Sequence, residues 1–141
     1  MTQSQTIHAT CVAWNDRAVL IRGGSGSGKS TLGLVLMGMG CSLVADDRVI
    51  VMRNDDRLLA RAPDTIRGLI EARGIGVLNA DPTAQAQVVL VVDLDETESE
   101  RLPPRRVVTL LGSDVPLIHA VDGPHFAPAI LQLLKAGWSD R

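Results

Sequence analysis

Gly23-Gly-Ser-Gly-Ser-Gly-Lys-Ser30 has the pattern G-x-x-x-x-G-K-S, the signature of a phosphate-binding loop. The loop follows the apolar run at residues 18–21 and precedes a helix-like stretch at residues 30–39, which is the strand–loop–helix context that the motif requires. Glycines let backbone amides surround phosphate oxygens, and a helix N-terminus adds positive potential. Lys29 is expected to reach the terminal phosphates and the Ser30 hydroxyl to bind Mg²⁺. The predicted nucleotide-binding residues are Gly23, Gly24, Ser25, Gly26, Ser27, Gly28, Lys29, Ser30 and Thr31. The simpler alternative is a Gly/Ser-rich turn that caps a helix.

Composition limits the possible classes of protein. The 141 residues predict a single domain over residues 1–141, large enough to bury its own core. No apolar run is as long as a membrane span, and the first residues lack a secretory signal pattern. A net charge of −2 favours neither nucleic acid nor an anionic membrane as partner. Cys11 and Cys41 lie in apolar stretches, which is typical of reduced, buried thiols in a cytoplasmic protein.

The pattern of apolar runs and turns predicts a strand-rich α/β fold with few helices, in which a β-hairpin leads into the phosphate loop. The elements expected before the middle of the chain are hairpin strands at 7–14 and 18–22, a helix at 30–39, a strand at 41–45 and a second hairpin at 49–52 and 58–61. Residues 65–79 give a mixed pattern. Beyond them we expect a buried strand at 88–92, a mobile loop at 97–106, short strands at 107–111 and 115–118, and a closing helix at 126–134.

Phosphoryl transfer also needs a carboxylate at the metal and a group that orients the nucleophile. The competing groups are Asp46-Asp47, Glu71, and Asp93 with its acidic neighbours Asp95 and Glu96. Asp93 follows an apolar run, the usual arrangement for a metal carboxylate, but a solvated strand end has the same pattern. Asp46-Asp47 could equally be a turn, although adjacent carboxylates are costly unless a cation neutralises them.

Four segments together resemble the catalytic domain of the bacterial HPr kinase/phosphorylase family. They are His8, the phosphate loop, Val44-Ala-Asp-Asp-Arg-Val49 and Glu71-Ala-Arg-Gly-Ile-Gly-Val-Leu-Asn79. Weaker similarity continues at Glu100-Arg-Leu102 and Gly123-Pro124. The chain resembles a compact, catalytic-domain-only variant of the proteobacterial type, without the family's N-terminal regulatory domain. Gly24 stands where the family usually has Asp.

The resemblance implies an ATP- and Mg²⁺-dependent kinase that phosphorylates a serine of HPr, the phosphocarrier of the phosphotransferase system, and that in many members also dephosphorylates it. It implies a fold similar to that of phosphoenolpyruvate carboxykinase and a homo-oligomer, usually a hexamer. By this resemblance, Asp46 would be the base and His8 would sit beside it. Ser30, Asp47 and Glu71 would surround the metal. Arg73 and Arg101 would contact phosphate or the transferring group.

Two other functions remain open at this point. One is a regulatory ATP-binding module with little catalysis. The other is an ordinary phosphate-loop small-molecule kinase or NTPase with Asp93 at the metal. Arg105-Arg106, beside the expected mobile loop, is a candidate contact for an acidic partner, although a solvated loop end is the simpler interpretation.

Overall fold

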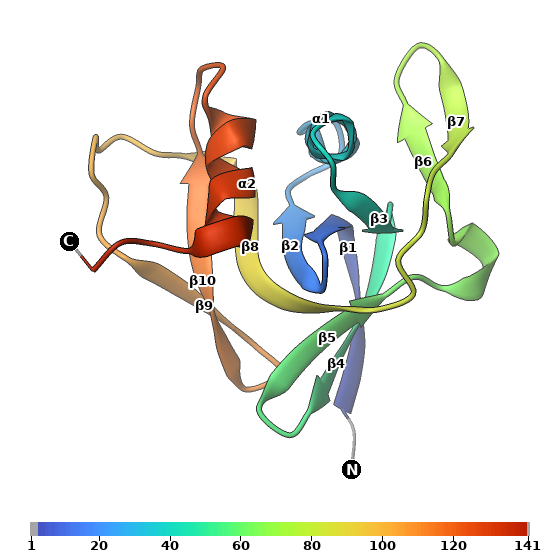
Figure 1. Ribbon diagram of the computed structural model, residues 1–141, viewed down its shortest axis with the longest axis horizontal. Helices are drawn as coiled ribbons and strands as arrows, with labels where there is room; N and C mark the ends of the chain where they lie inside the picture. The colour runs from blue at the N-terminus through green and yellow to red at the C-terminus, as the bar shows by residue number, and fades with distance from the viewer. Residues whose placement is uncertain (1–2, 141) are drawn as a thin grey trace.

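A computed structural model of the chain describes residues 3–140 and shows a strand-rich α/β fold (Figure 1). In the first half of the chain the elements are β1 (Gln3–Trp14), β2 (Arg17–Arg22), α1 (Lys29–Gly38), β3 (Ser42–Ala45), β4 (Arg48–Asn54), β5 (Arg57–Arg61) and a 3₁₀ turn (Asp64–Ile66). The remaining elements are β6 (Leu69–Ala72), β7 (Gly76–Asn79), β8 (Ala86–Thr97), β9 (Arg106–Leu110), β10 (Ser113–Ala120) and α2 (Phe126–Ala136). Both expected hairpins, β1–β2 and β4–β5, are confirmed.

The main sheet closes on itself. Its strands run in the order β2-β1-β4-β5-β8-β10-β9, and β2 also pairs with β8, so the first strands of this order form a ring. The β2–β8 and β10–β8 pairings are parallel. β3 pairs with β1 beyond the end of β4, so β1 runs alongside both. The carboxyl end of β2 is thereby fixed between β1 and β8, and the phosphate loop leaves from this point.

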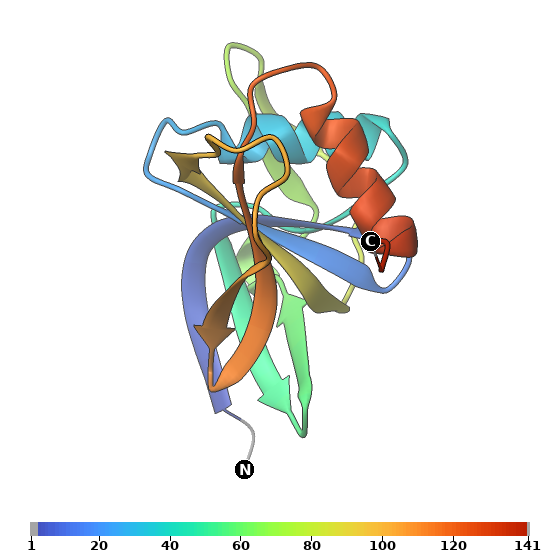
Figure 2. The same ribbon diagram turned by 90° about the vertical axis from the view of Figure 1, so that its left-hand side faces the viewer.

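Both faces of the central strands are buried. Cys11 and Leu20 belong to an apolar cluster built from strand residues, whereas their neighbours Val12 and Ile21 pack in a second cluster with residues of α1 and α2. The two helices lie together on one side of the sheet (Figures 1 and 2). Double-sided burial explains why β2 is a continuous apolar run at residues 18–21 and why the buried half of β1, residues 9–13, is apolar apart from Thr10.

β6 and β7 form a separate two-stranded hairpin that projects beyond the main sheet next to α1 (Figure 1). The mixed sequence pattern of residues 65–79 did not predict it. Its glycines explain the ambiguity: Gly74, in the turn, and Gly76, at the start of β7, have φ angles of 82° and 137°, which favour glycine.

One strand is longer than expected. β8 continues through Asp93 and Asp95 to Thr97, whereas the apolar pattern ends at residue 92. The extension pairs with β10 across Asp93 and Thr97, so backbone pairing carries the strand beyond its apolar residues. Within residues 3–140, no helix is both long and apolar enough to cross a membrane.

Candidate active site

The phosphate loop lies between β2 and α1 and is shaped by glycines. Gly26 and Gly28 have φ angles of 81° and 98°, in the left-handed region that favours glycine. The Ser27 amide donates to the Gly24 carbonyl at 3.1 Å and closes the loop on itself. α1 begins at Lys29, directly after Gly28, so the unpaired amides of its first turn are presented to the loop. This arrangement suits an anion.

Lys29 is the buried cation of the loop. Its ammonium donates to the carbonyls of Gly23 at 2.9 Å and Gly24 at 3.0 Å. An ammonium has three N–H donors, so two bonds to the loop leave one for a ligand oxygen. Lys29 therefore both stabilises the loop and contributes positive charge to the pocket that it lines.

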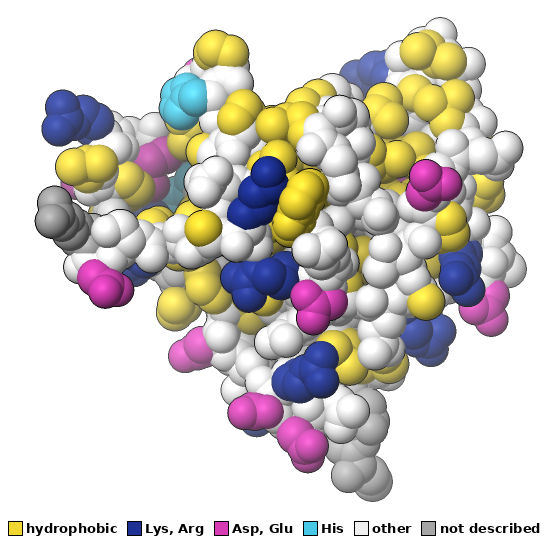
Figure 3. All heavy atoms as spheres, viewed as in Figure 1, with side chains coloured by type: hydrophobic (Ala, Val, Ile, Leu, Met, Phe, Trp, Pro, Cys, Tyr) yellow, Lys and Arg dark blue, Asp and Glu magenta, His cyan; other side chains and the backbone are white. Residues whose placement is uncertain are grey.

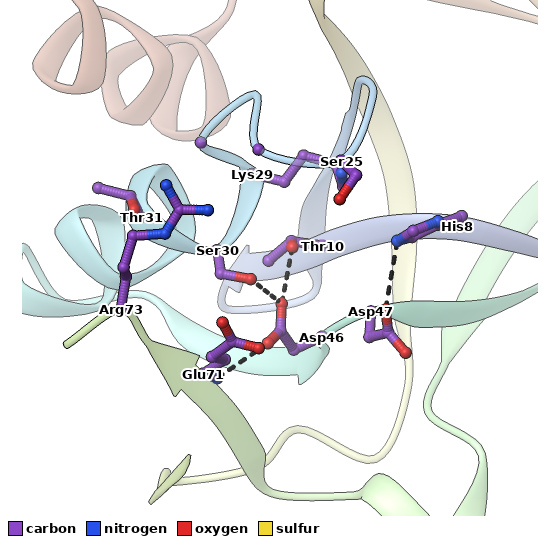
Figure 4. A pocket seen from close by; sticks show the side chains of 12 residues that line it. His8, Thr10, Ser25, Lys29, Ser30, Thr31, Asp46, Asp47, Glu71 and Arg73 are labelled. Atoms are coloured by element: carbon purple, nitrogen blue, oxygen red, sulfur yellow. Dashed lines mark hydrogen bonds and ion pairs between the residues drawn. The ribbon is translucent and has the colours of Figure 1, made fainter. Parts of the chain in front are cut away.

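Asp46 is a buried carboxylate with donors on both oxygens (Figure 4). Oδ1 accepts from the hydroxyls of Thr10 at 2.8 Å and Ser30 at 2.6 Å, and Oδ2 accepts from the Glu71 amide at 3.0 Å. These donors come from β1, α1 and β6. Asp46 thus joins the phosphate loop to the projecting hairpin.

Asp47 points elsewhere. β3 ends at Ala45 and β4 begins at Arg48, so the two aspartates form the break between strands that both pair with β1. Asp47 has a φ angle of 71°, uncommon for a residue with a side chain, and its carboxylate is 66% exposed. Its Oδ1 lies 3.2 Å from Nε2 of His8 (Figure 4).

The expected pairing of His8 with Asp46 is therefore corrected: His8 pairs with Asp47. The reason is the backbone turn. His8 is the register partner of Arg48, one residue after Asp47, and the positive φ of Asp47 sends its side chain toward β1 on the exposed side. The inner position beside Asp46 is taken by Thr10.

These side chains surround a pocket of about 190 Å³. Its lining comprises His8, Thr10, Ser25, Gly26, Gly28, Lys29, Ser30, Thr31, Asp46, Asp47, Glu71 and Arg73. Gly23, Gly24 and Ser27 form the loop outside this lining. The volume is below that of a complete small-molecule pocket, which suits a phosphate chain rather than a whole nucleotide.

The donor set fits Mg²⁺. Across residues 3–140, no three His, Cys, Asp or Glu side chains are grouped so as to hold a metal by themselves. Mg²⁺ normally uses one or two carboxylates together with substrate phosphates and water, so it does not need such a group. The hydroxyl of Ser30 against the carboxylate of Asp46, with Glu71 on the same pocket, supplies hard oxygens of this kind.

Two candidate residues lie outside this pocket. Arg101 lines a separate pocket of about 520 Å³ between β10, α2 and the loop after β8. Asp93 lies 3.8 Å from Arg22 and accepts from the Asp95 amide. Neither residue lines the pocket around Ser30 and Asp46. Asp93 lies opposite Arg22, just before the phosphate loop, so the alternative with Asp93 at the metal has less geometric support than Asp46.

Arg105 and Arg106, the basic pair at the end of the loop after β8, also line this second pocket. Arg106 donates to Glu98 through both Nε and NH2, and Arg105 stacks over the Trp138 ring at 4.5 Å. Burial alone would raise the pKa of Glu98, but hydrogen bonds from Glu100, Arg106 and Ser99 hold it below its ordinary value. Arg106 is thus committed within the chain and is a poor contact for an acidic partner.

Two contacts of the site, those made by Thr10 and by Asp95, were not predicted from the sequence. Thr10 lies two residues after His8 on the same strand, so period-two alternation could have placed it on the same face. The Asp95 carboxylate accepts from the Gly24 amide at 2.9 and 3.1 Å. No local signal indicates this second contact, because it depends on the parallel pairing of β2 with β8.

The chain matches the family model described as HPr Serine kinase C-terminal domain over residues 1–105. It is 34% identical over 110 residues to the HPr kinase/phosphorylase of Streptococcus mutans, covering 72% of this chain and 35% of that protein. It is 32% identical over 145 aligned positions to the HPr kinase/phosphorylase of Latilactobacillus sakei, covering 97% of this chain and 44% of that protein. The chain thus spans less than half the length of these relatives.

A solved structure is also similar. The Hpr(Ser) kinase/phosphatase from Coxiella burnetii superposes with a TM-score of 0.75 at 27% sequence identity. The match covers 93% of this chain and 88% of that one. The two chains therefore share the same overall fold.

Proposed function

This chain belongs to the family of the HPr serine kinase C-terminal domain, and on that premise we propose that it transfers the terminal phosphoryl group of ATP to a serine of an HPr-like phosphocarrier. The observation that carries the proposal is the convergence of a phosphate loop, a buried carboxylate and an exposed carboxylate–imidazole pair on one polar pocket. A nucleotide-binding module without catalysis would need the loop but not the exposed pair.

The loop side of the pocket would hold the phosphates. The amides of residues 28–30, at the start of α1, and the remaining N–H of Lys29 would face the anion, and a bound triphosphate would extend toward Asp46 and Asp47. Ser30, Asp46 and Glu71 would hold Mg²⁺, which when bound offsets the negative charge of the phosphates. Arg73, on the turn of the projecting hairpin, lines the same pocket and adds a second cation for the transferring group.

We assign the acceptor side to Asp47, with His8 as its support, and the metal side to Asp46. This exchanges the roles that the resemblance implied for the two aspartates. Asp46 already accepts three hydrogen bonds, one of them from Ser30, and a hydroxyl next to a strand-end carboxylate is the usual metal-side pair of phosphate-loop enzymes. The Asp47 carboxylate is exposed and so can be reached by an incoming hydroxyl, with His8 at 3.2 Å and Arg48 at 3.8 Å to orient it.

The reaction then follows in one displacement. The serine Oγ forms a bond to the terminal phosphorus while the bond from that phosphorus to the bridging oxygen breaks and ADP leaves. The serine proton passes to the Asp47 carboxylate. Because the transition state is loose, the carboxylate needs correct position more than high basicity.

The test is mass spectrometry of HPr after incubation with the protein, Mg²⁺ and ATP, which should give phosphoserine. Asp47→Asn should lower kcat by about 100-fold or more while Mg²⁺-nucleotide affinity is retained. Asp46→Asn and Ser30→Ala should instead weaken Mg²⁺-nucleotide binding. Asp56→Asn is the matched control. Asp56 is an exposed residue in the turn between β4 and β5 and does not line the pocket, so this variant should change neither quantity.

Each part of the proposal can fail separately. Absence of phosphoserine with wild-type protein would overturn the kinase assignment. Loss of nucleotide binding in Asp47→Asn, with normal binding and lost transfer in Asp46→Asn, would restore the roles that the resemblance implied. A parallel reaction with phosphorylated HPr and inorganic phosphate measures the dephosphorylating direction.

A further inference from the structure

The projecting β6–β7 hairpin has one buried and one open face. Directly opposed residues of an antiparallel pair lie on the same face of the sheet. Ile70 opposes Leu78, and both pack into the helix-side core. Glu71 opposes Val77, so Val77 lies on the same face as the carboxylate that lines the phosphate pocket. The open face of the hairpin is therefore continuous with the mouth of that pocket.

This open face ends in apolar side chains. Ile75 is 78% exposed and Val77 is 67% exposed, although both are aliphatic. A Cβ atom added at Gly74 or Gly76 would meet nothing within 4 Å, so the tip stands clear of the rest of the described chain. Figure 3 shows hydrophobic side chains gathered at the end of this hairpin, in the upper right of the view. Folding alone gives no reason for apolar residues here, because they cover no core.

We propose that the tip of this hairpin, Ile75 and Val77, is a docking surface for the protein that carries the acceptor hydroxyl, through apolar side chains next to its serine. The inference rests on the proposed function and names how its substrate is recognised. The pocket itself is lined by polar and charged side chains and suits phosphate, so it offers little to distinguish one serine-bearing chain from another. Recognition must come from the rim, and the hairpin is the part of the rim that carries exposed apolar groups.

The position of the tip favours a transient protein substrate over a second copy of this chain. Glu71 and Arg73 belong to the same hairpin and line the pocket, so a permanently bound copy on this face would obstruct the entrance. A substrate protein, in contrast, must cross this rim to bring its hydroxyl to Asp47. Apolar contacts away from the reacting atoms would supply binding energy, while the polar groups inside the pocket carry out the transfer.

The experiment compares the double variant Ile75→Ser/Val77→Ser with two matched controls. Val35→Ser on α1 and Leu102→Ser in the loop after β8 remove apolar side chains that are 47% and 80% exposed but lie on other elements. The double variant should raise KM for HPr by about tenfold or more. KM for ATP and kcat should stay within about twofold, and neither control should change KM for HPr. Calorimetric titration of HPr into protein saturated with Mg²⁺ and a non-hydrolysable ATP analogue should show the same loss of affinity.

The outcomes separate the docking proposal from the kinase proposal. Unchanged KM and unchanged HPr affinity in the double variant would overturn the docking surface and leave the kinase intact. HPr binding that the double variant loses, without phosphoserine in the wild type, would support docking and overturn the kinase. A change in oligomeric state by light scattering, with normal HPr affinity, would assign the tip to a second copy instead. Wild-type protein that neither binds nor phosphorylates HPr would overturn both.

Discussion

The Asp95 carboxylate holds the start of the phosphate loop through the amide of Gly24, at 2.9 and 3.1 Å. Asp95 lies on the extension of β8 and Gly24 follows β2, so the contact links the loop to its parallel neighbour strand. The backbone amide of Asp95 in turn donates a hydrogen bond to Oδ1 of Asp93 at 2.9 Å, which helps to position Asp95. The loop is thus fixed at both ends, by this carboxylate and by the first turn of α1.

Asp95→Ala should therefore weaken nucleotide binding rather than slow transfer. The lost bond is exposed, so we expect about a three- to tenfold rise in Kd for Mg²⁺-ATP with nearly unchanged kcat. Titration calorimetry measures the affinity. Glu96→Ala removes the adjacent exposed carboxylate and is the control. Equal effects of the two variants would show that general charge, not the Gly24 contact, is responsible.

Thr10 is expected to stabilise the folded protein through the hydrogen bond that its hydroxyl donates to Asp46. Thr10→Val keeps the shape of the side chain but removes a buried donor to Asp46. A buried hydrogen bond to a charged group contributes about 1.5–3 kcal/mol, so the free energy of unfolding in urea should fall by a similar amount. Thr10→Ser, which keeps the donor, should recover most of the loss. Equal stability of Thr10→Val and wild type would contradict the role of this bond.

Substitution by alanine at two glycines of α1, Gly33 and Gly38, should change the stability of the protein in opposite directions. A Cβ atom at Gly33 would lie 2.7 Å from Cγ2 of Thr10, whereas one at Gly38 would meet nothing within 4 Å. In a helix interior alanine is about 1 kcal/mol more favourable than glycine, and Gly38, the last residue of α1, should gain part of this. Gly38→Ala should therefore stabilise the protein, while Gly33→Ala should destabilise it and weaken Mg²⁺-nucleotide binding, because it displaces Thr10 from Asp46. Thermal unfolding measured side by side checks both signs.

The Glu98–Arg106 pair predicts an acid-dependent loss of stability. Hydrogen bonds hold the folded-state pKa of Glu98 below its ordinary value of 4.5. A lowered pKa stabilises the folded protein above the unfolded value, and that stabilisation is lost as pH falls through the folded one. The difference in unfolding free energy between wild type and Glu98→Gln should therefore be largest near neutrality and shrink below about pH 4.5. A constant difference across this range would show that the carboxylate's ionisation does not contribute.

The local sequence was sufficient to predict the strand, loop and helix that form the phosphate loop. The G-x-x-x-x-G-K-S spacing, the apolar run before it and the following helix need contacts between neighbouring residues only. The double-sided burial of β2 also follows from its apolar run at residues 18–21. Period-two and period-3.6 patterns predict such elements well because burial imposes them directly.

The site could be predicted only in part. Asp46 and Asp47 are adjacent, and no local pattern separates a carboxylate buried under Thr10 and Ser30 from one that faces His8. The separation depends on the φ angle of Asp47 and on how β1 passes both β3 and β4. Arg101 was expected at the phosphate site from resemblance, whereas it lines the separate pocket beside α2, together with Glu98 and Arg106.

β8 both pairs with β2 and carries Asp95, the residue that bonds the phosphate loop. This has a consequence for the order in which nucleotide binding returns during refolding. β8 pairs in parallel with β2, whose residues lie about 70 positions earlier, and closing so long a segment makes such pairing slow compared with hairpin formation. Asp95 can reach Gly24 only after that step. Nucleotide affinity should consequently return late, after the hairpins have formed, which makes ATP binding a kinetic marker for the joining of the two halves of the chain.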